Sequence, residues 1–253
     1  WLVQDPLAEK YYSVSAYNYC VNNPVCSIDV EGKLVIFING FGPKVVDLGK
    51  ASYWNGFDEK VMNWLGDYNS KYFDGSIKGP LNMILNSILE PPHNVSSNTI
   101  LPLNTIASNR YDEGYATGSS SAAQIISSLK RDSNGNIIEP ITGIAYSMGT
   151  VYSKGFFQAL IDYVKANPDK CKGVNLTEYN FGAFQAESYD AVDGVDTYQF
   201  INKEDWISGS GVIKGALPKV LMSPPGFAHG LTNYEQFINY IIKLNPEVKI
   251  EIK

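Results

Sequence analysis

The sequence is poor in charge and has no long uninterrupted apolar segment. Charged residues make up 18% of the 253 residues, and the 26 acidic side chains outnumber the 20 basic ones, which gives a net charge of −6. Without a Lys/Arg stripe to neutralise phosphates, we expect no nucleic-acid partner. No apolar run reaches the roughly 18 residues of a bilayer-spanning helix, and no signal peptide is recognisable. The chain begins at Trp1 within what reads as ongoing sequence, so we expect it to be the C-terminal part of a longer protein.

Cysteine and histidine are also scarce. The three cysteines, Cys20, Cys26 and Cys171, are too few for a disulfide framework, although one bridge between the first two stays open. Their spacing fits no metal-binding pattern, and two histidines in the whole chain add nothing to it. We therefore expect neither a metal nor a cofactor.

Residues 1–32 differ in character from the rest. They are rich in Tyr, Asn, Pro and Val, lack helical periodicity, and carry turn signals at Asn22-Asn23-Pro24 and Glu31-Gly32. One interpretation is a short β-rich arm without a function of its own. The stretch also resembles the end of the Rhs-repeat-associated core of bacterial polymorphic toxins, through Asp5-Pro6-Leu7, Tyr17-Asn18-Tyr19, Asn22-Asn23-Pro24-Val25 and Ile28-Asp29-Val30-Glu31-Gly32.

That resemblance implies that residues 33–253 form a toxin domain, delivered by a bacterial secretion system into target cells and accompanied by a cognate immunity protein. Some such cores cleave themselves after an Asp-Pro-x-Gly-Leu motif. Here Val30 replaces the proline and Lys33 follows the glycine, so the motif is incomplete.

From Lys33 onward, apolar runs alternate with amphipathic segments. This alternation predicts an α/β fold with a mostly parallel sheet and helices on both faces. Residues 93–118 are rich in Asn, Ser and Pro and are predicted to be loop-like. The expected strands are 34–38, 141–146, 174–181, 195–201 and 248–252, and the expected helices are 57–68, 119–129, 151–166 and 234–244.

The strongest local signal is Gly143-Ile144-Ala145-Tyr146-Ser147-Met148-Gly149, where a predicted strand enters and a helix leaves. A nucleophile elbow needs small residues two positions before and after the nucleophile, because larger side chains clash across the tight turn. Ala145 and Gly149 meet this need, so Ser147 is the predicted nucleophile, although an ordinary turn with an N-cap serine fits the same letters.

An activated serine needs a base and an acid that orients the base. In α/β-hydrolases the chain order is Ser, acid, His, which selects His229 over His93. The acid should follow a core strand between the two, and Asp205 is the first choice. Its rivals are Glu204, Asp196 and Asp193.

An oxyanion hole needs two backbone N–H donors. Met148, directly after the nucleophile, supplies one. The loop after the first strand, Asn39-Gly40-Phe41-Gly42-Pro43, should supply the other, from Phe41 first and Gly40 next.

Four blocks together resemble the class 3 lipase branch of the α/β-hydrolases: Asn39-Gly40-Phe41-Gly42, Tyr146-Ser147-Met148-Gly149, Glu178-Tyr179-Asn180-Phe181-Gly182-Ala183, and Phe200 to Ile207 followed by His229. Asn39 and Ala145 stand where the family usually has His and Gly. The match covers about residues 33–240 with an insertion at about 45–118, in which an apolar stripe over 77–89 fits either a lid or core packing.

The resemblance implies a lipase or phospholipase acting on lipid esters at the membrane surface, and with the Rhs-like start, an antibacterial effector. A non-lipid esterase or thioesterase, or an inactive fold serving as an interaction module, are the alternatives.

Overall fold

The computed structural model describes residues 34–41, 47–76, 103–208, 211–221, 229–231 and 234, without the side chains of 103–106 and 219–221. The chain divides into two units, Trp1–Gly32 and Lys33–Lys253, and every described residue belongs to the second. The predictions for residues 1–32, for the apolar stripe at 77–89, and for the last helix and strand lie outside the described residues, apart from Tyr234.

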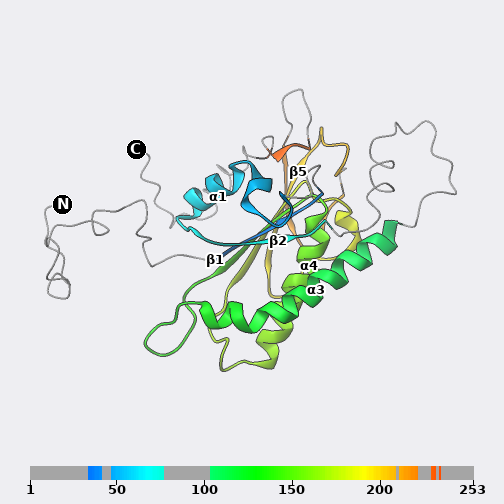
Figure 1. The fold of residues 1–253 in the computed structure, drawn as a ribbon. Coiled ribbons are helices and arrows are strands. Elements are labelled where there is room, and N and C mark those ends of the chain that lie inside the picture. Colours follow the sequence, from blue (N-terminus) through cyan, green and yellow to red (C-terminus); the bar gives the residue numbers. More distant parts are fainter. Residues whose placement is uncertain are drawn as a thin grey trace, which may run out of the picture. The chain divides into compact units, whose positions relative to one another are not determined.

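A parallel sheet forms the centre of the fold (Figure 1). Its order is β2-β1-β3-β4-β5-β6, and every neighbouring pair is parallel. The strands are β1 (Leu34–Asn39), β2 (Asn69–Asp74), β3 (Ile141–Tyr146), β4 (Leu176–Phe181), β5 (Asp196–Asn202) and β6 (Leu217–Leu221). This arrangement confirms the predicted fold class, an α/β fold with a mostly parallel sheet.

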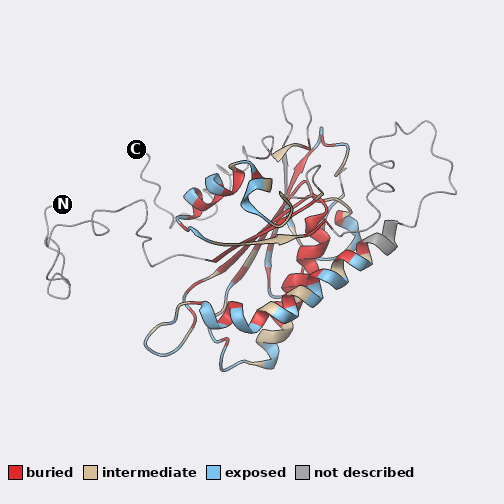
Figure 2. Cartoon of the chain, viewed as in Figure 1, coloured by how far each residue is buried: buried red, intermediate tan, exposed pale blue. Residues whose placement is uncertain are grey.

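Helices cover both faces of the sheet, as Figures 1 and 2 show. The alternation of side chains along β1 divides the core in two. Leu34, Ile36 and Ile38 pack with α3 (Leu103–Ser128) and α4 (Gly149–Ala166). Val35 and Phe37 pack with η4 (Ala51–Trp54) and α1 (Phe57–Leu65) on the opposite face. All six residues of β1 and of β3 are buried, which explains why these strands read as continuous apolar runs.

The helix predicted over 57–68 ends earlier, at Leu65. Gly66 adopts a left-handed backbone (φ 68°) and donates its N–H to the carbonyls of Met62 and Asn63, a helix stop that glycine favours. Tyr68, the last residue of the predicted helix, lies beyond its end and is 55% exposed. The chain then forms β2, an edge strand of sequence NSKYFD whose polar composition hid it from prediction.

The loop predicted over 93–118 is wrong from residue 103 onward, where α3 begins. Likewise, the insertion expected at about 45–118 contributes α1, β2 and half of α3 to the central fold. The described helices include none that is both long and apolar enough to cross a bilayer, and the 26-residue α3 is no exception.

Glycines explain how a helix with so few large apolar residues packs. A Cβ at Gly114 would lie 2.0 Å from the carbonyl oxygen of Tyr152, and one at Gly155 would lie 2.0 Å from that of Tyr111. Gly118 is nearly as close to Phe156, at 2.6 Å from its carbonyl oxygen. The backbones of α3 and α4 are therefore in close contact at these glycines, each of which faces the backbone of a residue with a large side chain on the other helix.

We predict that Gly155→Ala destabilises the protein by about 2 kcal/mol, because the added methyl group overpacks the α3–α4 contact. In a solvent-exposed helix the same change would stabilise the protein by about 1 kcal/mol. A loss of stability instead of a gain would therefore identify the close contact between the two helices. Denaturant unfolding measures the effect. Ser119→Ala, an exposed substitution on α3, should change stability by less than about 0.5 kcal/mol. A Gly155→Ala protein as stable as the wild type would contradict the contact.

Candidate active site

Ser147 lies on a strained turn between β3 and α4. Its backbone is left-handed (φ 55°), which non-glycine residues rarely adopt. Its N–H donates to the carbonyl of Phe181 (3.0 Å), and its own carbonyl accepts from the N–H of Phe184 (3.2 Å). A Cβ at Gly149 would lie 2.6 Å from the carbonyl oxygen of Ile38. Strain of this kind is typical of functional residues, and the requirement for a small residue after the serine has a visible cause.

The three residues predicted as a triad lie together. The Nε2 atom of His229 is 2.8 Å from the Oγ of Ser147, and its Nδ1 atom is 2.6 Å from the Oδ2 of Asp205. All three residues are buried. The rival acids Glu204, Asp196 and Asp193 are exposed, and His93 lies outside the described residues.

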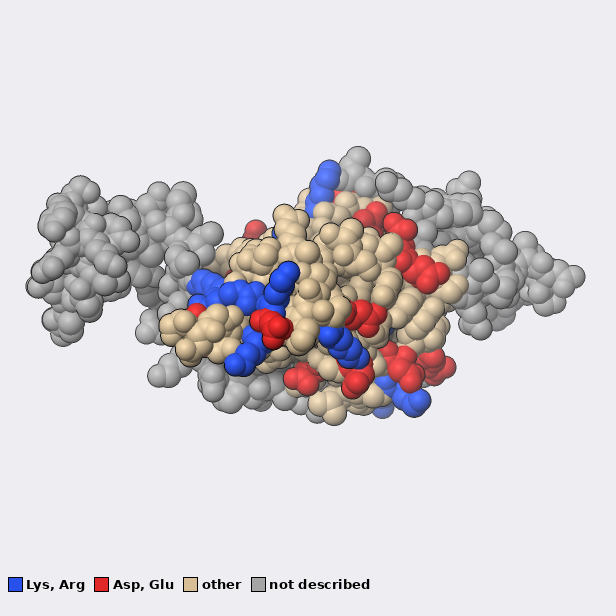
Figure 3. Space-filling model, turned by 90° about the horizontal axis from the view of Figure 1, so that it is seen from below, with Lys and Arg blue, Asp and Glu red and all other residues tan. Residues whose placement is uncertain are grey.

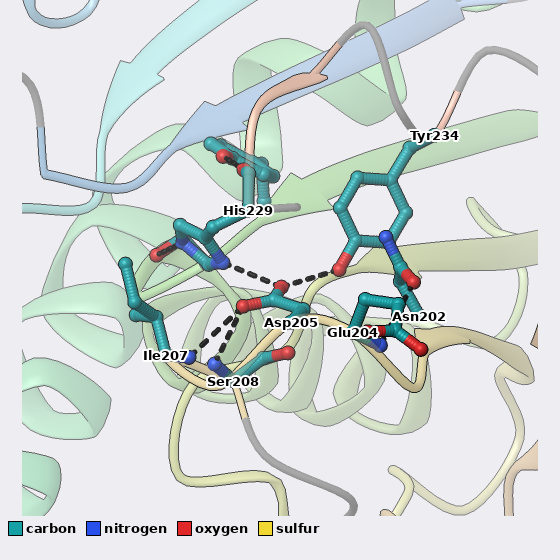
Figure 4. Close-up of polar contacts among 9 residues, drawn as sticks. Asn202, Glu204, Asp205, Ile207, Ser208, His229 and Tyr234 are labelled. Carbon is teal, nitrogen blue, oxygen red and sulfur yellow. Dashed lines mark hydrogen bonds and ion pairs between the residues drawn. The ribbon is translucent and has the colours of Figure 1, made fainter. Parts of the chain in front are cut away.

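Asp205 is held by four donors (Figure 4). Its Oδ1 accepts the N–H groups of Ile207 (3.0 Å) and Ser208 (3.1 Å), and its Oδ2 accepts His229 and the hydroxyl of Tyr234 (2.5 Å). Burial alone raises the pKa of this carboxyl, but the hydrogen bonds and the charge of His229 outweigh burial, so the pKa of Asp205 lies below its usual value. The acid is therefore ionised at neutral pH.

Two tyrosines that the sequence analysis did not single out support this arrangement. Burial, followed by the charge of Asp205, raises the pKa of Tyr234, so its hydroxyl stays a proton donor to the carboxylate. Tyr146, directly before the nucleophile, donates its hydroxyl to the carbonyl oxygen of His229. Its ring stacks on the imidazole, with centroids 5.2 Å apart and planes inclined by 28°. A tyrosine beside a predicted nucleophile was the only signal in the sequence for the second contact.

The predicted oxyanion loop lies against the elbow. A Cβ at Gly40 would be 2.7 Å from the Cβ of Ser147 and 3.0 Å from the backbone nitrogen of Met148. Among the described residues, neither Met148 N–H nor Phe41 N–H has a hydrogen-bond acceptor. The Met148 N–H directly follows the nucleophile and Phe41 directly follows Gly40, and the catalytic role of both N–H groups stays a prediction. Gly42 and Pro43 lie outside the described residues.

Asn39 gives this loop its orientation. The side-chain amide donates from Nδ2 to the carbonyl of Gly40 (2.7 Å), and its Oδ1 accepts the N–H of Gly49 (2.7 Å). The hydroxyl of Tyr53 donates to the carbonyl of Phe41 (2.9 Å). A trans peptide is planar, so fixing the Gly40 carbonyl also fixes the opposite direction of the Phe41 N–H. Asn39 therefore fixes the direction of the N–H that is predicted to be the second oxyanion donor.

The described residues contain no group of three or more His, Cys, Asp or Glu side chains placed to hold a metal ion. Cys171 is a buried free thiol, and Cys20 and Cys26 lie outside the described residues. The chemistry that the arrangement offers is nucleophilic: a buried serine, an imidazole to take its proton, and an ionised acid behind the imidazole.

We predict that Tyr234→Phe lowers stability at pH 7 by about 2 kcal/mol, the usual contribution of a hydrogen bond to a charged group. Because the folded-state pKa of Asp205 lies below its ordinary 3.8, the contribution is present above about pH 4 and is lost as the pH falls through the folded pKa. In unfolding curves measured from pH 7 down to about pH 2, the stability of the wild type should therefore fall toward that of Tyr234→Phe. A stability difference that does not change with pH would show that the hydroxyl does not act through the carboxylate.

No protein-family model matches the sequence, and no curated protein matches it either. Among solved structures, one similar chain is described as "the putative cell surface hydrolase from Lactobacillus plantarum WCFS1". The two share 10% sequence identity, the match covers 87% of this chain and 94% of that chain, and the TM-score is 0.43. Similarity at this level says nothing about activity, and any proposed activity must come from the geometry of the site.

Proposed function

We propose that the chain is a serine hydrolase that cleaves carboxylic esters of lipids. The observation that carries the proposal is the unbroken chain of contacts from Ser147 Oγ through the imidazole of His229 to the carboxylate of Asp205, at 2.8 Å and 2.6 Å. In this arrangement His229 takes the proton of Ser147 as the oxygen attacks the ester carbonyl. The N–H groups of Met148 and Phe41 receive the negative charge that develops on the carbonyl oxygen.

The second half of the reaction uses the same groups. His229 returns the proton to the departing alcohol, and a water molecule activated by the same imidazole then cleaves the acyl-serine. The ionised Asp205 stabilises the imidazolium and holds its Nδ1–H in the required tautomer. A thioester or a non-lipid ester would pass through the same steps, so the triad alone does not select the substrate.

An exposed tryptophan favours a lipid surface over a soluble substrate. Trp206, directly after the acid of the triad, is 68% exposed. Tryptophan favours membrane interfaces, where its ring meets the acyl region and its N–H stays hydrated. The surface seen in Figure 3 carries Lys and Arg beside Asp and Glu, with much uncharged area between them. Because the net charge of −6 gives no long-range attraction to anionic membranes, we infer that apolar contact brings the site to its substrate.

The resemblance of residues 1–32 to an Rhs core suggests a biological role for the proposed lipid hydrolase. With a lipid hydrolase following a segment that resembles a polymorphic-toxin core, we infer an effector that a secretion system delivers to degrade target-cell membranes. A cognate immunity protein in the producing cell is part of the same proposal. Membrane damage in cells that express the wild type, absent with Ser147→Ala, is the matching cellular measurement.

We predict that Ser147→Ala abolishes ester hydrolysis and labelling by a fluorophosphonate probe. Asp205→Asn should reduce kcat by about three to four orders of magnitude, because the imidazole then takes the wrong tautomer. The matched controls Glu204→Gln and Asp196→Asn, both exposed acids near the same strand, should keep near-normal rates. A folded Ser147→Ala protein with full activity would refute the triad, and collapse in a control would reassign the acid.

We also predict that Trp206→Ser lowers the rate on phospholipid vesicles about tenfold, since burying an indole at an interface contributes about 1.5–3 kcal/mol, part of which reaches the rate. Hydrolysis of a soluble short-chain ester should change less than twofold. Vesicle flotation and the two rates give the comparison. Equal losses of rate on both substrates would mean that Trp206 helps to position Asp205 and does not contact a membrane.

A further inference from the structure

One buried cation lies against the elbow and has no carboxylate partner among the described residues. Arg110 of α3 is only 1% exposed. Its Nη1 donates to the Oε1 of Gln185 (2.6 Å), and its Nη2 donates to the sulfur of Met148 (3.5 Å). Its guanidinium carbon is 5.8 Å from the centre of the Phe184 ring, and its Nε has no hydrogen-bond partner. Burial lowers the pKa of Arg110 to about 10, so the guanidinium stays charged at neutral pH.

The contacts of Arg110 reach two segments that hold the nucleophile. Met148 directly follows Ser147 and carries the first predicted oxyanion donor. Phe184 donates its N–H to the carbonyl of Ser147 (3.2 Å), and Gln185 is the next residue in the chain. The backbone of Gln185 is left-handed (φ 58°), which non-glycine residues rarely adopt. Arg110 therefore joins the residue after the nucleophile to the segment that binds the nucleophile's carbonyl.

The packing of α3 on α4 brings the guanidinium to this place (Figure 1). Gly114 lies one turn after Arg110 on α3, and a Cβ at Gly114 would be 2.0 Å from the carbonyl oxygen of Tyr152. Since Tyr152 belongs to the first turn of α4, the two backbones are in contact just beside the elbow. The arginine side chain therefore has a fixed origin from which it reaches Met148.

This position is unfavourable for the stability of the fold. Met148 is the N-cap of α4, an 18-residue helix. The beginning of a helix carries a partial positive charge, so a cation is disfavoured there. A buried charge surrounded by neutral groups is also costly, because it has lost its water and gained no counter-charge. Two unfavourable terms at one side chain are typical of a residue that serves function.

Ester hydrolysis supplies the negative charge that the resting site lacks. As Ser147 attacks, the carbonyl oxygen becomes negative beside the N–H of Met148. Standard bond lengths place the nitrogen of Met148 about 5 Å or less from its own sulfur, so the guanidinium lies on the order of 10 Å from that oxygen. In a partly buried site, a unit charge at this distance changes a rate about tenfold. The cation and the beginning of α4 favour the same charged transition state.

We propose that the charge of Arg110 stabilises the negative oxygen of the transition state, while its hydrogen bonds position Met148 and Gln185 around the nucleophile. This inference rests on the proposed function, because it requires Ser147 to attack an ester. It holds for any ester, lipid or not. Arg110 touches no reacting atom, so it is a positioning residue, and the bond-breaking step stays with the triad.

The first test is Gln185→Glu, which gives the guanidinium a carboxylate partner with almost no change of shape. Pairing the buried charge should raise the melting temperature by about 3 °C. The same carboxylate should lower kcat on a soluble short-chain ester about tenfold, with KM changed less than twofold, because the charge acts only as the oxyanion develops. Gln124→Glu makes the same substitution at an exposed position of α3 and should change neither quantity.

The second test removes the charge itself. Arg110→Met keeps a long side chain that packs against Met148 but carries no charge, and it should lower kcat about tenfold at an unchanged KM. Arg110→Lys keeps the charge and should restore part of the lost kcat. A role in packing alone predicts the opposite pattern, in which Gln185→Glu gains stability and keeps the kcat of the wild type.

Several outcomes would overturn this role of Arg110. A Gln185→Glu protein with normal kcat would exclude the electrostatic effect, and one without added stability would show that the guanidinium is already compensated. A rise in KM in place of a fall in kcat would assign Arg110 to substrate binding. If one of the two variants does not fold, the other decides. A wild type that neither cleaves esters nor reacts with fluorophosphonate refutes the proposed function, whereas an active wild type with unaffected variants refutes this inference alone.

Discussion

Backbone contact at the end of β1 is the constraint on which the whole site depends. A Cβ at Gly149 would lie 2.6 Å from the carbonyls of Ile38 and Asn39, and one at Gly75 would lie 2.8 Å from the Cα of Gly149. With Gly40 equally close to Ser147, the ends of β1, β2 and β3 meet without any side chain between them. This contact holds the serine in its left-handed conformation and brings the oxyanion loop against it. Glycine is required at these positions because any side chain would overlap neighbouring backbone atoms, as it would between α3 and α4.

Two buried cations in the described part of the chain, Lys154 and Arg110, have different surroundings. Lys154 of α4 forms an ion pair with Glu178 of β4, and the hydroxyl of Ser153 donates to the same carboxylate at 2.5 Å. That cluster is satisfied within the fold and joins the elbow helix to the sheet. Arg110 has an amide, a thioether and the ring of Phe184 (5.8 Å) around it. Among the described residues, the lysine has a carboxylate partner, whereas the arginine is surrounded by neutral groups.

The sequence was most informative where all the requirements of a structural feature lie within one short segment. The elbow at Ser147 needs small neighbours, an apolar strand before it and a helix after it, and all three can be read locally. His229 followed from chain order and Asp205 from its place after a core strand, and the structure brings His229 to the serine and Asp205 to His229. Strand β2 and residues 103–118 of α3 escaped prediction, because an edge strand tolerates polar residues and this part of the helix packs through glycines. Tyr234, Asn39 and Arg110 escaped because their roles depend on contacts between residues distant in the chain, which no local pattern encodes.

Tyr146 has a consequence for how the site can evolve. Its ring and hydroxyl hold His229 from the strand that also presents the nucleophile. The end of β3 therefore positions the base as well as the nucleophile. A substitution of Tyr146 would disturb both reacting groups at once, so two adjacent positions in the chain preserve the alignment of the reacting atoms.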